Sequence, residues 1–244
     1  MAIGKFLNIA VMLGAFAGQA SAQCRQALAL GLDVSGSVDA QEYRMQLDGL
    51  RAALNDPKVV RALIGSYDHH VRLLVYEWSS ADFQRILVPW TQMETQADLA
   101  QVSRQLSQTT RQSSGPSTAL GSAMSFGLNA LTQQSECWGH TLDISGDGIS
   151  NTGPRPQDVS DQNGPDGAVV NGLTIGVAIQ DNLHIPQIGD LNAYYRAYVI
   201  RGPSAFVETA IGFEDYQNAM TRKLLRELQS IAIGAGPHPH HPAG

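Results

Sequence analysis

An apolar run from Ala27 to Val34 leads directly into the polar segment Asp33-Val34-Ser35-Gly36-Ser37, and a helical pattern follows it. Asp39 and Glu42 have the spacing of a capping box, which predicts a helix start, and 55–57 (Asn-Asp-Pro) predicts its end. The apolar positions of this helix are Tyr43, Leu47, Leu50 and Leu54. We therefore predict a strand, a polar loop and a helix in direct succession.

The same alternation continues along the chain. Two runs rich in β-formers, 71–78 and 83–90, are separated only by 79–82, and a spacer this short favours a hairpin over a crossover. Further strands are predicted at 140–145, at 173–179 and near 206–207, and further helices at 94–108, 120–131, 191–198 and 213–231. Alternating strands and helices predict an α/β fold with a doubly wound, mostly parallel sheet and one antiparallel edge strand.

The first 22 residues have the composition of a leader. Lys5 precedes an apolar stretch, and the small residues 20–22 (Ala-Ser-Ala) form a cleavage-type sequence, so we predict a signal peptide over 1–22. The apolar stretch is too short for a spanning helix, so no stable membrane anchor is expected. The expected location is periplasmic or secreted. Residues 235–244, rich in Pro and His, are predicted to be a disordered tail.

Charge and cysteine content narrow the class further. The formal net charge is −6, with 22 acidic against 16 basic residues, which argues against nucleic acid and anionic membranes as partners. The two cysteines, Cys24 and Cys137, are disulfide candidates in an exported chain; the alternative is two separate buried thiols. If the strands after them are neighbours, the disulfide lies at the end of the sheet opposite Asp33.

Oxygen-bearing side chains gather where strands are predicted to end. In parallel sheets, binding sites lie at the carboxyl ends of the strands, and both Asp33 and Asp147 fall there. With Ser35, Ser37 and Thr118 they form a set of carboxylates and hydroxyls, which suits Mg²⁺ or, with the same donors, Mn²⁺ or Ca²⁺. The competing interpretation is that the serines only cap the following helix.

The three segments together resemble the von Willebrand factor type A (vWA) domain. Its Asp-x-Ser-x-Ser signature matches 33–37, a Thr before a helix matches Thr118, and an Asp-Gly-x-x-Asn run matches 147–151. The resemblance covers residues 23–234 and implies a Rossmann-like fold with a metal-ion-dependent adhesion site. The segments Glu77-Trp78-Ser79 and Val88-Pro89-Trp90-Thr91 resemble an uncharacterised exported bacterial branch of this family.

The resemblance implies a role for each site residue. Ser35, Ser37 and Thr118 would ligate the cation directly, and Asp33 and Asp147 would act mostly through water. An open coordination position would accept a carboxylate from an unknown partner protein.

Three positions leave alternatives open. Ser117 competes with Thr118 for the second loop, and Gly146 stands where many relatives place Thr or Ser before the final Asp. Asp143 is predicted inside a buried strand, where a carboxylate needs partners. It either orients a ligand of the metal or is a structural residue bonded to backbone amides.

The leading hypothesis is an exported binding module that engages an acidic group of a protein through its metal, and not an enzyme. The alternative is a metal-dependent hydrolase of phosphate or ester substrates, in which the ion polarises the reacting oxygen. The sequence contains no Gly-x-Ser-x-Gly, His-Glu-x-x-His or phosphate-loop motif, which disfavours the hydrolase. A third possibility is a structural domain whose site is idle.

Overall fold

A computed structural model describes residues 23–65, 69–176 and 188–234. Within them the strands are β1 Gln23–Asp33, β2 His69–Trp78, β3 Gln84–Met93, β4 Gly139–Gly146, β5 Val169–Gly176 and β6 Val207–Ile211. The helices are α1 Ala40–Leu54, α2 Pro57–Ile64, α3 Gln96–Gln108, α4 Leu120–Thr132, α5 Ile188–Tyr194 and α6 Tyr216–Gly234. The predicted leader (1–22) and tail (235–244) lie outside the described residues and stay predictions.

The strands form one six-stranded sheet in the order β3-β2-β1-β4-β5-β6. The β2–β3 pair is antiparallel, and the other neighbouring strands are parallel. The predicted fold class is therefore confirmed, including the antiparallel strand at one edge. Pro89 lies inside β3, and an edge strand tolerates proline because one side of it forms no ladder hydrogen bonds.

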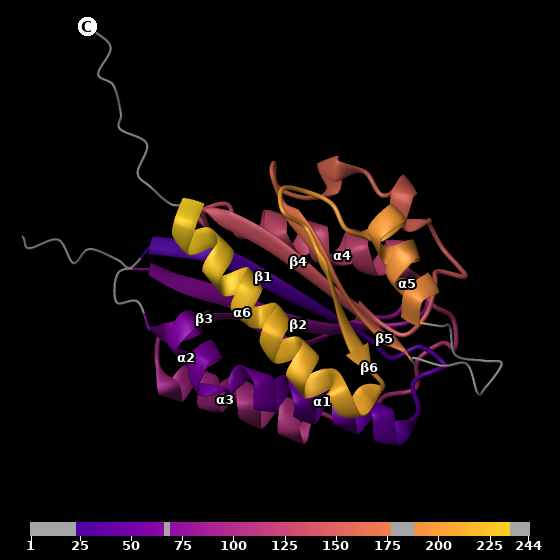
Figure 1. Ribbon diagram of the computed structural model, residues 1–244, viewed down its shortest axis with the longest axis horizontal. Coiled ribbons are helices and arrows are strands. Elements are labelled where there is room, and N and C mark those ends of the chain that lie inside the picture. Colours follow the sequence, from indigo (N-terminus) through magenta and orange to yellow (C-terminus); the bar gives the residue numbers. More distant parts are fainter. Residues whose placement is uncertain (1–22, 66–68, 177–187, 235–244) are drawn as a thin grey trace, which may run out of the picture.

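Helices cover both faces of this sheet (Figure 1). Apolar side chains of α1, α2, α3 and α6 pack with Leu28, Leu30 and Leu32 of β1 on one face. Side chains of α4 and α5 pack with Ala27 and Ala29 on the other face. Because both faces are buried, β1 has no polar alternation, which is why its sequence is a continuous apolar run.

The local signals around α1 were mostly correct. Asp39 caps the helix by accepting hydrogen bonds from the amides of Gln41 and Glu42, and the Glu42 carboxylate accepts one from the Asp39 amide. The chain does not stay in a loop after the predicted stop, however. Pro57 is the first residue of α2 and Asp56 caps it. The prolyl ring fits the first turn of a helix, so this Pro marks a helix start as well as an end.

Two other boundaries differ from the sequence prediction. The strand predicted at 173–179 runs over Val169–Gly176, and 177–179 lie outside the described residues. Residues 151–168, for which no strand or helix is predicted, contain two short 3-10 turns, Pro156–Asp158 and Asp161–Asn163. Arg201 holds this segment by donating to the carbonyls of Pro156 and Val159, so a distant side chain orders what the local sequence leaves irregular.

Cys24 and Cys137 form a disulfide at the end of the sheet where β1 and β4 begin. Both cysteines are buried, at 3% and 4% exposure. The predicted disulfide and its place opposite Asp33 are thus present in the structure.

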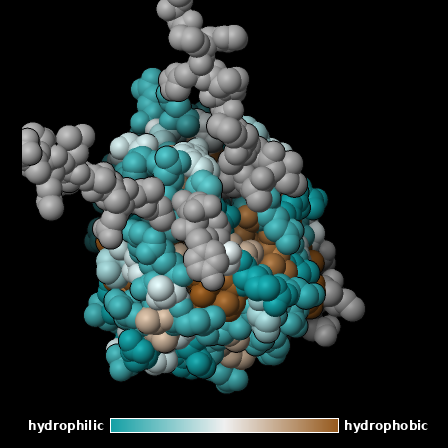
Figure 2. All heavy atoms as spheres, turned by 90° about the vertical axis from the view of Figure 1, so that its left-hand side faces the viewer, coloured by the Kyte–Doolittle hydropathy of each residue, from teal (hydrophilic) through white to brown (hydrophobic). Residues whose placement is uncertain are grey.

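Figure 2 views the molecule from the side at which β1 begins. Hydrophilic residues cover most of this surface, with hydrophobic residues gathered in small patches between them.

Asp143 is held by a buried ion cluster between β4 and α6. The Lys223 ammonium lies 3.1 Å from Asp143 Oδ1 and 2.8 Å from Glu227 Oε1, and these side chains are at most 2% exposed. Asn171 also donates to Glu227, at 2.8 Å. Asp143 is therefore a structural residue that pairs with a lysine of the last helix. Neither open interpretation of Asp143 included this partner.

We expect the cluster to make stability depend on pH. Burial, followed by the repulsion of Glu227, raises the pKa of Asp143 to about 7, although Lys223 opposes the shift. The carboxyl pKa is about 3.9 in an unfolded chain, so the folded state holds the proton more tightly. The contribution to stability is complete below pH ~4 and is lost as pH rises to ~7, at no more than about 1.4 kcal/mol per pH unit.

The measurement is urea denaturation of the wild type and Asp143→Asn from pH 4.5 to 8. The free energy of unfolding of the wild type should fall with rising pH relative to that of the variant, because the variant has no ionisable group at position 143. Parallel curves would contradict the raised pKa.

Candidate metal centre

The first site loop begins at the carboxyl end of β1. The Val34 amide still donates to the Trp78 carbonyl, at 2.8 Å, after which the chain turns away from the sheet. The Ser35 amide donates to Asp33 Oδ1 at 2.8 Å, so the carboxylate is bonded to the backbone at the start of the loop. Asp33 and Ser35 are buried, at 1% and 0% exposure, whereas Ser37 is exposed.

Four of the predicted site residues form one chain of oxygen contacts. Ser35 Oγ lies 3.3 Å from Ser37 Oγ and 3.4 Å from Thr118 Oγ1. The Ser37 hydroxyl donates to Asp147 Oδ1 at 2.7 Å. Residues from the loop after β1, from the turn before α4 and from the loop after β4 thus converge, although 110 positions separate Ser37 from Asp147. The competing interpretation, that the serines only cap the following helix, is not needed, because Asp39 caps α1.

The segment before α4 fastens the first loop. The Arg111 guanidinium donates to the carbonyls of Val34 and Ser35, each at 3.3 Å, and to that of Val38. The Ser114 hydroxyl adds a bond to the Val34 carbonyl at 3.0 Å. These bonds connect the first loop to the segment before α4. Sequence reasoning missed Arg111 and Ser114, because nothing local marks a side chain that bonds to backbone 70–80 positions away.

Gly36 is required by the same contact between the loops. Its amide donates to the Pro116 carbonyl at 3.0 Å, and a Cβ on Gly36 would lie 3.0 Å from the Pro116 side chain. A side chain at position 36 would therefore be crowded against the second loop.

The second and third loops are joined by a pair of hydrogen bonds. The Thr118 amide donates to Asn151 Oδ1 and the Asn151 amide donates to the Thr118 carbonyl, both at 2.9 Å. Thr118 is 6% exposed and its hydroxyl contacts Ser35, whereas Ser117 is half-buried. The geometry therefore places Thr118, and not Ser117, in the hydroxyl cluster.

The carboxylates are poorly compensated by the protein. Burial and then the repulsion of Asp147 raise the pKa of Asp33 to about 8, and burial raises the pKa of Asp147. Asp33 Oδ2 is buried and has no hydrogen-bond partner among the described residues. Buried carboxylates need a counter-charge. A divalent cation beside these three hydroxyls and two carboxylates would supply one, so the residues fit such an ion.

The donor set also restricts the kind of ion. Among the described residues, no group of three or more His, Cys, Asp or Glu comes together as a metal site. The candidate centre is instead rich in hydroxyls, and oxygen donors of this kind suit hard ions such as Mg²⁺. Ser37 is exposed and Asp147 half-buried, so one side of the cluster faces solvent and a partner group can approach it.

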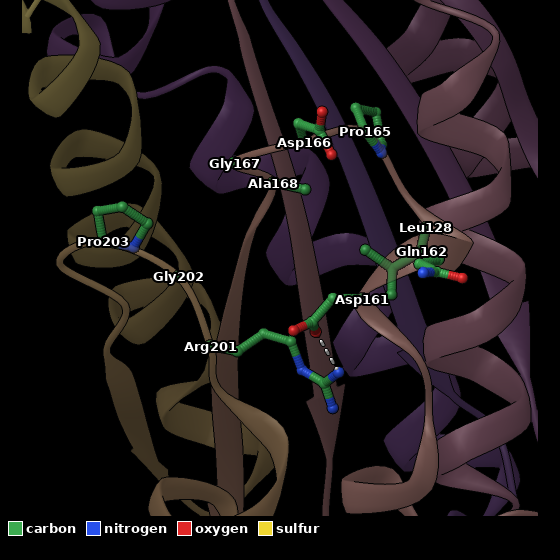
Figure 3. A pocket seen from close by; sticks show the side chains of 10 residues that line it. All are labelled: Leu128, Asp161, Gln162, Pro165, Asp166, Gly167, Ala168, Arg201, Gly202 and Pro203. Atoms are coloured by element: carbon green, nitrogen blue, oxygen red, sulfur yellow. Dashed lines mark hydrogen bonds and ion pairs between the residues drawn. The ribbon is translucent and has the colours of Figure 1, made fainter.

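A pocket elsewhere in the molecule does not overlap this centre. It has a volume of about 270 Å³ and lies beside 165–168, at the amino end of β5. Figure 3 shows the Arg201 and Asp161 side chains pointing toward one another at its border, with 2.9 Å between Arg201 Nη1 and Asp161 Oδ1. The candidate centre lies at the carboxyl ends of the parallel strands, the opposite end of the sheet.

The sheet order, with its antiparallel edge strand, is that of the vWA-type fold. The chain belongs to the family described as "Protein of unknown function (DUF1194)", whose model matches residues 23–232. None of the curated proteins compared with the chain is similar to it in sequence.

Several solved structures share the fold. Proximal thread matrix protein 1 from the mussel byssus is 15% identical, with a TM-score of 0.59; the match covers 85% of this chain and 49% of that one. For a von Willebrand factor type A protein from Catenulispora acidiphila the identity is 11%, the coverage 85% and 43%, and the TM-score 0.56. The PilB minor pilin from Streptococcus sanguinis is 11% identical, with a TM-score of 0.60, and the match covers 88% of this chain and 64% of that one.

The chain thus spans between about two fifths and two thirds of the length of these structures. At such identities the likeness shows the fold. No helix in the described part of the chain is both long and apolar enough to cross a membrane.

Proposed function

We propose that this chain is an exported binding module that holds a divalent cation and uses it to engage a carboxylate of a partner protein. The observation that carries the proposal is the convergence of the Ser35, Ser37 and Thr118 hydroxyls beside Asp33 and Asp147. Ser35, Ser37 and Thr118 would hold the ion directly, and the two aspartates would hold its water ligands. The cation supplies a positive centre on a solvent-facing edge.

The related structures support this proposal. One structure of the mussel matrix protein is described as having a zinc-occupied MIDAS motif, the abbreviation of metal-ion-dependent adhesion site. Another structure with this fold is a pilus adhesin from Lactobacillus rhamnosus GG. Matrix and pilus proteins act outside the cytoplasm, which agrees with the signal peptide predicted at 1–22. We propose Mg²⁺ as the ion, because the donors are oxygens and none is a histidine or cysteine.

We expect Mg²⁺ to stabilise the mature wild-type chain and not the Asp33→Ala variant. A ligand that binds only the folded state adds about 2.7 kcal/mol to the free energy of unfolding at a concentration of 100 Kd. Thermal unfolding in EDTA and in increasing Mg²⁺ measures this shift. Asp158→Ala is the matched control, because this aspartate is exposed and its carboxylate pairs with Arg155 at the surface, away from the candidate centre. Equal unfolding temperatures of the wild type with and without Mg²⁺ would contradict the metal.

Capture of envelope proteins tests the partner. The mature chain is immobilised and exposed to native envelope extract in Mg²⁺ or in EDTA, with Asp33→Ala beside it. A protein retained only by the wild type in Mg²⁺, and released when free acetate competes, supports recognition of a carboxylate. Retention that is equal in EDTA and in the variant would count against it.

An assay of turnover distinguishes the metal-dependent hydrolase from the binding module. Phosphate and ester substrates are offered with Mg²⁺ or Mn²⁺ to the wild type and to Asp147→Ala. A binding module gives no turnover above background in either chain. Metal-dependent turnover that the variant lacks would favour the hydrolase.

A further inference from the structure

Gly146, the residue before Asp147, is a glycine for a reason of space. Its φ is not positive, so the backbone there does not require glycine. A Cβ on Gly146 would lie 2.5 Å from the Tyr195 hydroxyl oxygen and 3.0 Å from Asp33 Oδ2. A carbon and an oxygen that are not bonded to each other do not approach to 2.5 Å, so a side chain at 146 would collide with the Tyr195 hydroxyl. The tyrosine hydroxyl therefore occupies the space that a side chain at 146 would fill.

Tyr195 follows α5 and lies against one face of the sheet, over β4 and β5. It begins the π-helical turn Tyr195–Val199 that continues α5, and it is 0% exposed. Its ring lies over Gly172 of β5, where an added Cβ would come within 2.6 Å of a ring carbon. Gly172 pairs with Ile144, two residues before Gly146. Two neighbouring strands thus lack a side chain where this one tyrosine lies.

The Tyr195 hydroxyl and Asp33 Oδ2 are complementary groups that border one small space. Both are fully buried, and neither has a hydrogen-bond partner among the described residues. A phenol hydroxyl can donate a hydrogen bond and a carboxylate oxygen can accept one. A buried donor and a buried acceptor left unpaired each cost free energy, so a bond between them is favoured.

We propose that Tyr195 is a positioning residue of the metal centre: its hydroxyl donates a hydrogen bond to Asp33 Oδ2, directly or through one water, and sets the carboxylate for the cation. This inference rests on the proposed function. Asp33 Oδ1 is already held by the Ser35 amide, so the bond from Tyr195 would fix the second oxygen and with it the plane of the carboxylate. Outer partners of this kind typically change metal affinity by about 10- to 100-fold.

The geometry also predicts how substitutions at the two positions interact. Of the Tyr195 atoms only the hydroxyl oxygen lies within 3.6 Å of the added Cβ, so removing that oxygen opens the space. Gly146→Ser should be destabilising alone and tolerated in Tyr195→Phe. In the double variant the serine would return a hydroxyl next to Asp33 Oδ2. Residues in contact show such non-additive effects.

The experiment measures Mg²⁺ affinity by calorimetry and thermal stability in EDTA for the mature wild type, Tyr195→Phe, Gly146→Ser and the double variant. Tyr76→Phe is the matched control, because Tyr76 is equally buried and its hydroxyl donates to the Ala123 carbonyl at 2.8 Å, outside the centre. We expect Tyr195→Phe to weaken Mg²⁺ binding about 10-fold or more. Tyr76→Phe should lower stability similarly and leave the affinity within about twofold of wild type.

A spectroscopic measurement gives a readout independent of affinity. A hydroxyl proton held between Tyr195 and Asp33 exchanges slowly, so it should give a proton NMR signal that Tyr195→Phe lacks and that shifts when Mg²⁺ is added. The double variant should unfold at a higher temperature than Gly146→Ser and bind Mg²⁺ more tightly than Tyr195→Phe.

The outcomes separate this inference from the proposed function. If the wild type binds no Mg²⁺, the proposed function fails and the positioning role fails with it. If the wild type binds Mg²⁺ and Tyr195→Phe binds it equally well, only the role of Tyr195 is overturned. Should Gly146→Ser not fold, the comparison of Tyr195→Phe with Tyr76→Phe still decides.

Discussion

Lys223→Met should lower the free energy of unfolding by about 3 to 5 kcal/mol, the range seen when one partner of a buried ion pair is removed. The lysine is fully buried between Asp143 and Glu227, at 3.1 and 2.8 Å. Methionine fills a similar volume but leaves two carboxylates in the core without their cation. Urea denaturation at pH 7.5 measures the loss.

Arg222→Met is the matched control on the same helix. Arg222 is 51% exposed and pairs with Glu208 at the surface, where an ion pair contributes at most about 1 kcal/mol. Adding Asp143→Asn to Lys223→Met should recover part of the stability, since one buried charge is then removed. A Lys223→Met variant as stable as the Arg222→Met variant would show that the cluster contributes little.

Loss of the Cys24–Cys137 disulfide should cost about 4 to 5 kcal/mol on the loop-entropy model. The bond closes a segment with a sequence separation of 113, and a long loop has much conformational freedom in the unfolded chain. Both cysteines are buried beside the first residues of β1 and β4, so the native sheet also packs around the bond. Urea denaturation of the wild type, with and without a thiol reductant under native conditions, measures the effect.

The Cys24→Ser/Cys137→Ser variant provides the control for reduction. It should unfold at the urea concentration of the reduced wild type, and the reductant should not change it further. Because the constraint acts mainly on the unfolded chain, the variant should keep the Mg²⁺ response of the wild type. A difference below about 1 kcal/mol between oxidised and reduced protein would contradict the entropic estimate.

The sequence carried the fold class and the members of the candidate centre. Periodicity distinguishes strands from helices, and the short spacer 79–82 predicted the antiparallel pair at the sheet edge. Asp33, Ser35, Ser37, Thr118 and Asp147 were chosen because they follow strands or precede a helix. In a parallel sheet those ends meet at one edge, so a one-dimensional pattern was enough to predict their convergence.

The surroundings of the site could not be predicted in this way. Arg111 bonds to the carbonyls of the first loop, and the Tyr195 hydroxyl shares its space with Gly146 and Asp33. Such contacts depend on the angle at which a helix or loop crosses the sheet. Tyr195 is the fully buried member of the adjacent pair Tyr194 and Tyr195, and no local pattern distinguishes the two.

Asp143 shows most clearly which features the sequence predicts and which depend on tertiary packing. The prediction that Asp143 lies inside a buried strand is correct, and in the structure Asp143 and Ser145 both contact α6, through Lys223 and Tyr216. The identity of its partner depended on the register of α6 against the sheet, which no local pattern encodes. The sequence by itself determined which strands are buried and which strand ends meet. Only tertiary packing decided which buried charges and hydroxyls neutralise or orient one another, because those contacts join residues far apart in the chain.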